Sequence, residues 1–302
     1  MWSLTQAVRN WAYRGRPAAT PVRIGVALGG GFARVMTHVG VLQVLEENRI
    51  PICGIAGISS GAIIAATYAA GSTTEEIQST GMLTSFSSYA RWTLSKLGLA
   101  VNDRMTTYLQ KILLHRRFET MQIPLAVVAT DLATGAPAVF QGTGDVIDPI
   151  RASCAYPGLF LPVEIGGRYL VDGGMSVGVP VEAAAGLGAT HVLAVYLRTA
   201  PERNGPPTNI FQVVSRCFAI MQDRLEMDWE IPHLLLEPDV AAFDWDDFDR
   251  ASEMVAAGRQ AALAALPQIR AWLAAPAAPP RVRAGRRKKR SPLAPVSTFP
   301  EP

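Results

Sequence analysis

The sequence predicts an α/β fold, and two strand-to-helix junctions in its first quarter carry the prediction. Ile24, Val26 and Leu28 alternate as they do in a strand, and a glycine run and a helical pattern follow at once. Residues 53–56 form a second short apolar run, and a serine turn joins them to residues 62–70, which are apolar on every side like a buried helix. A chain of 302 residues with 49% hydrophobic content can bury a large core around such units.

The cysteines and the N-terminal residues indicate a reducing, cytoplasmic location. Cys53, Cys154 and Cys217 lie far apart in apolar surroundings, so we expect small core residues and neither a disulfide framework nor a zinc site. Residues 1–20 lack the apolar core of a signal peptide. No other metal ligand cluster is visible, and no cofactor is expected.

Residues 1–20 nevertheless contain an amphipathic pattern. Leu4, Ala7, Val8 and Trp11 fall at helical spacing, with arginines on either side of the stripe. The pattern predicts a short helix that either packs on its own domain or lies in a membrane interface with Trp11 as its anchor.

The glycine run after the first predicted strand places backbone N–H groups at the start of a helix. Such a loop can hold a phosphate or a developing oxyanion. A dinucleotide-binding loop is the alternative, but Arg34 and Val35 stand where the two possible registers need the last glycine of that motif. His38, on the helix that follows, is expected to be a packed core histidine.

The second junction reads Gly57-Ile-Ser59-Ser-Gly61. In a sharp strand-to-helix turn a central serine occupies a strained position, and the flanking glycines let neighbouring backbones pass closely. Such a turn aims the hydroxyl of Ser59 at a substrate. The alternative is an ordinary loop serine. The uncharged run 50–74 also allows a membrane span, but Pro51, four glycines and several hydroxyls favour a buried strand and helix.

The middle of the chain predicts further elements in order. Gly71 fits a helix end, and residues 72–76 offer two overlapping capping boxes for the next helix. Residues 81–117 mix apolar and basic side chains and predict helices that cover the site. Residues 123–130 form a buried strand with residues 138–140 as its hairpin partner. Asp131 between them is either a catalytic acid or, as an Asp often does, the cap of the turn.

The remaining elements lead to a second candidate for chemistry. The strand 168–171 delivers Asp172-Gly173-Gly174 into a tight turn, where Asp172 is either a general base for Ser59 or a structural turn residue. The other expected elements are a helix from Arg151 that Pro157 stops, a helix over 181–186, strands over 191–197 and 233–236, and a helix from the acidic segment 244–249 to Leu266.

The chain ends in a basic tail. Residues 281–290 contain seven Lys or Arg side chains and no acid. Because the whole chain has a net charge of +3, the rest of the chain has a net charge of about −4. Such a tail is either a solvated extension or a contact for anionic lipid headgroups, whereas nucleic acid is not expected because no basic face with aromatic residues accompanies it.

The order of the motifs separates two kinds of serine hydrolase. An α/β-hydrolase would need a later acid and a later histidine, but His191 and His233 stand at the start of predicted strands. A Ser–Asp pair without histidine is the more economical interpretation.

At this point the residues resemble the bacterial branch of the patatin-like phospholipase family, from about Arg23 to Leu266. The resemblance rests on three motifs: the glycine-rich motif at 28–34, the serine motif at 57–61 and the Asp-Gly-Gly motif at 172–174. Two sequence segments between the motifs, 124–132 and 151–158, also resemble the family. It implies a three-layer α/β/α domain with a central, mostly parallel sheet, here over 21–270, between the amphipathic segment 1–20 and an Ala/Pro-rich basic tail at 271–302.

The resemblance also implies roles for residues. Ser59 would be the nucleophile of a lipid acyl hydrolase that works through an acyl-enzyme, and Asp172 would be its base. The oxyanion hole would consist of backbone amides of Gly29, Gly30, Gly31 and Phe32, supported by Arg34, Gly57, Gly61, Gly173 and Gly174.

Departures from the family pattern keep a second hypothesis open. Phe32 and Val35 stand where members often have glycine, and Val177 replaces a common asparagine. The alternative function is therefore a catalytically weak or silent lipid-binding or scaffolding protein of the same fold.

Overall fold

The two junctions that predict the fold are neighbouring units of one sheet. The computed structural model describes residues 21–83, 86–88, 90–198, 206–207, 210–225 and 229–274. Strand β1 (Ile24–Leu28) pairs in parallel with β2 (Ile52–Ile58). The parallel centre of the sheet is completed by three further strands: β5 (Leu125–Asp131) beside β2, then β9 (His191–Val195) beside β1, and β10 (His233–Leu236) beside β9. The predicted N-terminal segment 1–20 and the basic run 281–290 lie outside the described residues.

Beyond β5 the sheet becomes antiparallel. The predicted hairpin is confirmed, because β6 (Pro137–Gln141) pairs with β5. Strand β8 (Arg168–Val171) also runs antiparallel to β5, and β7 (Val163–Ile165) pairs with β8 at the edge. The expected α/β fold with a mostly parallel central sheet is therefore confirmed.

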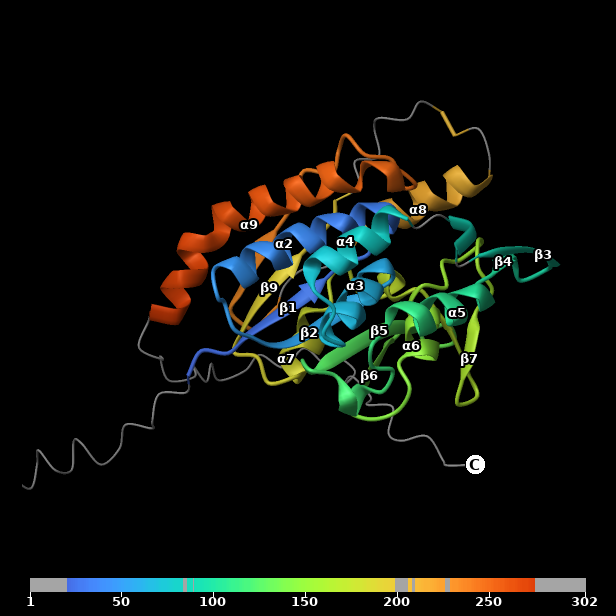
Figure 1. Cartoon of the computed structure of the whole chain (residues 1–302). Coiled ribbons are helices and arrows are strands. Elements are labelled where there is room, and N and C mark those ends of the chain that lie inside the picture. The colour runs from blue at the N-terminus through green and yellow to red at the C-terminus, as the bar shows by residue number, and fades with distance from the viewer. Residues whose placement is uncertain are drawn as a thin grey trace, which may run out of the picture.

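Alternation along the strands divides the core into two layers. Ile24, Val26 and Leu28 pack on one side of the sheet, while Ala27 belongs to the cluster on the other side. Figure 1 shows helices α2, α4 and α9 on the first side and α7 beneath the sheet. The small side chains on the second side let the short helix α7 approach β1 and β2 closely.

The helices of the described residues follow the predicted order with some different bounds. They are α2 (Met36–Glu47), α3 (Ser60–Ala69), α4 (Thr74–Met82), α5 (Asp103–Ile112), α6 (Ile147–Ser153), α7 (Val181–Gly186), α8 (Ile210–Arg224) and α9 (Ala251–Ala274). Gly71 follows the end of α3 with a φ of 99°, and Thr73 and Glu76 form a complete capping box at the start of α4. No described helix is long and apolar enough to cross a membrane.

The prediction of helices over 81–117 is wrong in part. Residues 103–112 are helical, but β3 (Arg91–Ser95) and β4 (Gly98–Val101) form an antiparallel hairpin. The hairpin docks on the segment before β7, because the Leu99 and Ala100 amides both donate to the Leu159 carbonyl, at 3.0 and 2.7 Å. The strand conformation of β4 is therefore stabilised by Leu159, a residue distant in sequence.

Three further expectations need correction. Helix α6 begins before Arg151 and ends at Ser153, before it reaches Pro157. Helix α9 continues through Pro267 to Ala274, because Leu266 and Ile269 on either side of the proline remain buried in the core. Cys217 is exposed on α8 and is not a core residue, whereas Cys154 is buried as expected.

Helices α2 and α9 pack at two glycines that leave no room for a side chain. A Cβ at Gly258 would meet the Thr37 carbonyl oxygen, and one at Gly40 would meet the Val255 carbonyl oxygen. Because backbone cannot move aside cheaply, Gly258→Ala is expected to lower the free energy of unfolding by about 1–3 kcal/mol despite the better helix propensity of alanine. Urea denaturation measures the change.

Gly186→Ala is the matched control for this prediction. A Cβ at Gly186 would meet nothing nearer than Gln141 Oε1, at 3.9 Å. Because alanine has the better helix propensity, Gly186→Ala should leave the free energy of unfolding unchanged or raise it slightly. A Gly258→Ala variant as stable as the control would contradict the close helix contact.

Candidate active site

Ser59 stands between the end of β2 and the start of α3 in a strained backbone conformation. Its φ of 52° and ψ of −136° lie outside the regions that residues with a side chain favour. The Ser59 amide donates to Ser153 Oγ at 2.8 Å, and Ser153 Oγ donates to the Val128 carbonyl at 2.6 Å. This buried relay holds the strained turn in place.

The flanking glycines permit the close approaches that the turn needs. A Cβ at Gly57 would lie 2.5 Å from Ala62 Cα, and one at Gly61 would meet the Gly29 carbonyl oxygen. The serine turn and the glycine loop after β1 are therefore in backbone contact. A Cβ at Gly30 would lie 2.8 Å from Ser59 Cβ, which puts the loop directly beside the serine.

Asp172 lies within hydrogen-bond distance of Ser59. The Ser59 hydroxyl donates to Asp172 Oδ2 at 2.7 Å, and the Gly174 amide donates to Asp172 Oδ1 at 2.8 Å. Gly173 packs against the Val128 carbonyl, where a side chain would not fit. The carboxyl is buried, and burial raises its pKa to about 7, although the hydrogen bonds from Ser59 and Gly174 act in the opposite direction.

Two of the four loop amides proposed for an oxyanion hole already have partners. The Gly29 amide donates to the Val195 carbonyl at 3.0 Å, and the Gly31 amide donates to Ser60 Oγ at 3.2 Å. Within the described part of the chain, the amides of Gly30 and Phe32 have no hydrogen-bond acceptor. Phe32 has a φ of 53°, a left-handed backbone conformation that is uncommon for a residue with a side chain.

Arg34 and His38 support the glycine loop from behind. Arg34 Nε donates to the Gly31 carbonyl at 3.2 Å. His38 is the packed core histidine that the sequence predicts, and burial lowers its pKa to about 4. The neutral ring donates from Nε2 to the Gly29 carbonyl at 2.8 Å, a contact that the sequence did not predict.

Asp131 is not part of this site. Its Oδ1 accepts the Ala133 and Thr134 amides, at 2.9 and 3.0 Å, and its Oδ2 forms an ion pair with Arg168 at 2.6 Å. The turn-cap interpretation is confirmed.

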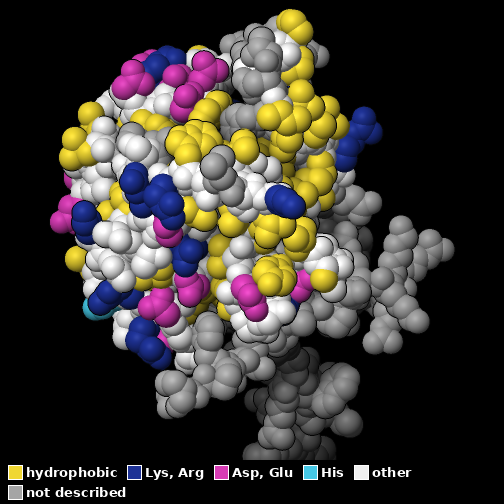
Figure 2. Space-filling view, turned by 90° about the vertical axis from the view of Figure 1, so that its right-hand side faces the viewer, with side chains coloured by type: hydrophobic (Ala, Val, Ile, Leu, Met, Phe, Trp, Pro, Cys, Tyr) yellow, Lys and Arg dark blue, Asp and Glu magenta, His cyan; other side chains and the backbone are white. Residues whose placement is uncertain are grey.

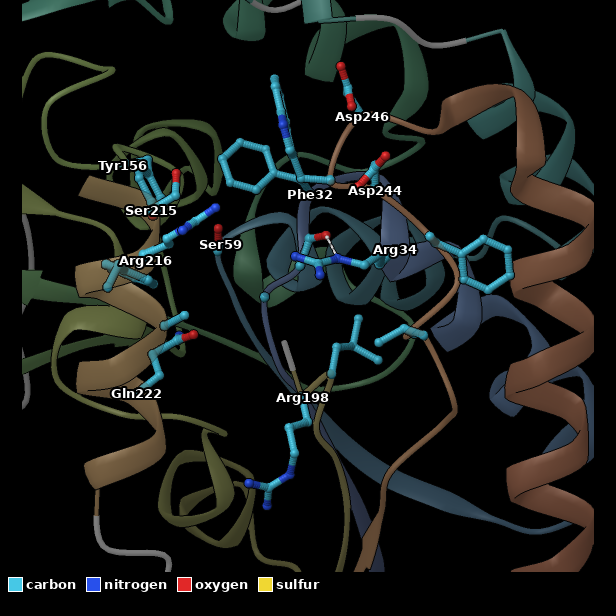
Figure 3. A pocket seen from close by; sticks show the side chains of 18 of the residues that line it. Phe32, Arg34, Ser59, Tyr156, Arg198, Ser215, Arg216, Gln222, Asp244 and Asp246 are labelled. Carbon is cyan, nitrogen blue, oxygen red and sulfur yellow. Dashed lines mark hydrogen bonds between the residues drawn. The ribbon is translucent and has the colours of Figure 1, made fainter. Parts of the chain in front are cut away.

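Two cavities of different chemistry meet at Ser59 and Asp172. Phe32 and Tyr156 also line both, with their ring centroids 5.4 Å apart. The larger cavity, of about 440 Å³, has a mixed lining (Figure 3). Apolar side chains such as Leu197, Phe243 and Trp245 share it with charged and amide side chains, which are Arg34, Arg198, Arg216, Asp244, Asp246, Gln212 and Gln222. The smaller cavity, of about 80 Å³, is lined by apolar side chains: Ala33, Val35, Met36, Ile63, Ile64, Met105, Phe160 and Phe248.

The wall formed by α8 is the main part of the site that sequence reasoning missed. Ser215, Arg216 and Gln222 extend from α8 toward the larger cavity in Figure 3, and Phe218 packs on Tyr156 with ring centroids 4.7 Å apart. The helical spacing of Val214, Phe218 and Met221 was the signal that could have revealed this helix.

Neither a histidine nor a metal cluster accompanies the pair. None of the four histidines, all of which are described, lines either cavity. In the described residues, no three His, Cys, Asp or Glu side chains form a group that could hold a metal ion.

Comparison with known proteins identifies the family. A sequence model of patatin-like phospholipases matches residues 26–185, which is more than half of the chain and includes Ser59 and Asp172. The chain belongs to the patatin-like phospholipase family. The matched region runs from β1 to α7, so the antiparallel strands around Asp172 belong to the patatin-like region as well.

Relatives of this patatin-like chain include NTE family proteins. An uncharacterized NTE family protein of Mycobacterium tuberculosis is 35% identical over 201 residues, which cover 65% of this chain and 55% of that protein. Lysophospholipase NTE1 of Cryptococcus neoformans is 29% identical over 181 residues, 57% of this chain and 11% of that protein. The chain thus spans about half the length of the mycobacterial relative.

Solved structures provide more distant neighbours of the patatin-like chain. VipD from Legionella pneumophila has 14% sequence identity and a TM-score of 0.49, over 83% of this chain and 68% of that one. Human GIVD cytosolic phospholipase A2 has 13% identity and a TM-score of 0.44, over 89% and 62% of the two chains.

The raised pKa of Asp172 has a consequence for stability. In the unfolded chain an Asp carboxyl has a pKa of about 4. Between about pH 4 and pH 7 the folded state therefore keeps a proton on Asp172 that the unfolded state has released. The group stabilises the fold at low pH and loses that contribution as the pH rises through about 7. Asp172→Asn is therefore expected to raise the free energy of unfolding above the wild type at about pH 8, by on the order of 2–4 kcal/mol.

Urea denaturation at a series of pH values tests this, with exposed Asp249→Asn as the control. The advantage of Asp172→Asn should vanish near about pH 4, where the wild-type group is protonated in both states. An Asp172→Asn variant that is less stable than the wild type at high pH would show that the carboxylate is not destabilised by burial.

Proposed function

We propose that this chain is a carboxylic-ester hydrolase of lipid esters, with Ser59 as nucleophile and Asp172 as general base. The observation that carries the proposal is the 2.7 Å hydrogen bond from the Ser59 hydroxyl to Asp172 Oδ2 at the junction of the two cavities. A carboxyl with a pKa of about 7 is matched to proton transfer near neutral pH. The family membership supports a lipid ester as the substrate class.

The reaction would proceed in two halves. Ser59 Oγ attacks the ester carbonyl carbon as its proton passes to Asp172, and a tetrahedral intermediate with a negatively charged oxygen forms. The intermediate collapses to an acyl-serine, and the alcohol leaves with the proton from Asp172. A water molecule then attacks the acyl-serine, again giving its proton to Asp172, and the carboxylic acid leaves as Ser59 recovers the proton.

The loop amides would stabilise the negative oxygen. The amides of Gly30 and Phe32 are the candidate donors, since the amides of Gly29 and Gly31 donate to Val195 and Ser60. Of the four residues expected to form the oxyanion hole, we therefore propose two, Gly30 and Phe32. His38 and Arg34 hold the carbonyls of Gly29 and Gly31, so the loop needs little rearrangement when charge develops.

The two cavities suggest how a lipid ester would be oriented in the site. The apolar cavity suits an acyl chain, and the cavity lined by guanidinium, carboxylate and amide groups suits a polar alcohol leaving group. The disabled-site alternative rested on Phe32 and Val35. The Phe32 ring packs between Tyr156 and Trp245, and Val35 lines the apolar cavity, so neither side chain separates Ser59 from Asp172.

A fluorophosphonate probe tests the nucleophile. The wild type should be labelled, and Ser59→Ala should abolish both labelling and ester hydrolysis because, among the described residues, no other hydroxyl contacts the carboxylate of Asp172. Ser60→Ala is the matched control, and it should remain labelled. Labelling that survives in Ser59→Ala and vanishes in Ser60→Ala would assign the nucleophile to the neighbouring serine.

The pH dependence of hydrolysis tests the base. Because Asp172 must lose its proton to act, kcat/KM should rise with pH and level off above a midpoint of about 7. Replacing His38, His115, His191 or His233 singly by glutamine should keep the midpoint and cost far less than the ~10³-fold that a catalytic residue costs. A histidine variant that loses the titration and the activity together would indicate a triad.

A further inference from the structure

The β3–β4 hairpin presents large apolar side chains to solvent. Trp92 is 67% exposed, Leu97 is 68% exposed, and Leu99 is also exposed. These two strands form their own small sheet and are not part of the central one. Lys96 stands at the turn beside Leu97, so a cation accompanies the apolar tip. Tryptophan, leucine and lysine together are typical of segments that enter a membrane interface.

Helix α8 carries a second exposed apolar stripe. Ile210, Val213, Cys217 and Ile220 fall on one side of the helix, and all four are exposed to solvent. The opposite side of α8 carries Phe218, which packs on Tyr156 in the site. A surface helix normally turns charged residues outward, so an apolar outer side calls for a partner.

One segment joins the hairpin and α8. Gly158 lies against Val214 of α8, at 3.5 Å from an ideal Cβ, and the next residue, Leu159, accepts the two amides of β4. Phe160 follows and lines the apolar cavity beside Ser59. Figure 2 looks onto this side of the molecule and shows hydrophobic side chains gathered on it. The two exposed patches thus flank the segment that leads to the site.

The charge of these elements has the opposite sign to that of the rest of the chain. Residues 86–112 and 210–225 contain six Lys or Arg side chains and two Asp, a net charge of +4, whereas the chain outside 281–290 carries about −4. Both acids are paired, Asp103 with Arg91 at 2.8 Å and Asp223 with Arg198 at 3.3 Å. A positive, apolar surface on a negative body complements an anionic lipid bilayer.

We infer that the β3–β4 hairpin and the outer side of α8 form a docking surface for an anionic lipid bilayer. The inference rests on the proposed function, since docking would place both cavities at the surface from which a lipid ester is drawn. Trp92, Leu97, Leu99 and the α8 stripe enter the interface, while Lys96 and the neighbouring cations contact headgroups. This places the membrane contact beside the active site, in addition to any contact that the chain ends make.

Vesicle sedimentation with the full chain tests the inference. The double variant Leu97→Asp/Ile220→Asp should lose at least tenfold in binding to phosphatidylcholine vesicles that contain phosphatidylserine, because each aspartate replaces an apolar side chain that enters the interface with a charged group that is costly to bury there at any salt concentration. The loss should persist at ~1 M salt, where a Debye length of about 3 Å screens the basic run 281–290. The matched control is Leu263→Asp, which alters a leucine that is 49% exposed on α9.

Hydrolysis of a soluble p-nitrophenyl ester separates this inference from the proposed function. Loss of vesicle binding with unchanged ester hydrolysis supports the docking surface, and the Leu263→Asp control should match the wild type in both assays. A double variant that binds vesicles as the wild type does, at low and high salt, overturns the inference. So does a finding by light scattering that the wild type forms a dimer that the double variant cannot form and that neither protein binds vesicles. An absence of hydrolysis in every variant would instead contradict the proposed function.

Discussion

The candidate site depends on one partly buried hydrogen bond between a hydroxyl at the end of one strand and a carboxylate at the end of another. Ser59 Oγ and Asp172 Oδ2 are 2.7 Å apart, but their residues are 113 positions apart in sequence. The antiparallel direction of β8 makes the contact possible. Val171 pairs with Thr130, so the chain that leaves β8 runs back toward Val128, which is the partner of Ile58 at the end of β2.

Close backbone packing protects that hydrogen bond. Gly57, Gly61 and Gly173 each stand where a side chain would collide with neighbouring backbone, and Ser153 ties the Ser59 amide to the Val128 carbonyl. The same packing excludes water from Asp172 and raises its pKa. Geometry and acidity therefore have one cause, which is the close approach of β2, β5 and the turn after β8.

The sequence allowed correct predictions where a feature depends on neighbouring residues, and it did not where a feature depends on contacts with residues distant in sequence. The serine turn, the Thr73 cap and the β5–β6 hairpin follow from residues within a few positions of each other. The β3–β4 hairpin depends on the Leu159 carbonyl, and the engagement of the Gly29 amide depends on Val195, so no local pattern could reveal either. Helix α8 had a periodic signal, but its place as a wall of the site depends on contact with Tyr156.

The sequence distance between Ser59 and Asp172 also bears on how the protein is made. Ordering a contact between residues so far apart costs loop-closure entropy, which only the completed β2–β5–β8 arrangement offsets. During synthesis Ser59 emerges first, and a nascent chain that ends at β5 has the hydroxyl without Asp172. The contact between Ser59 and Asp172 therefore cannot form until β8 and the turn after it have been made, whereas β9 and β10 follow later in the chain.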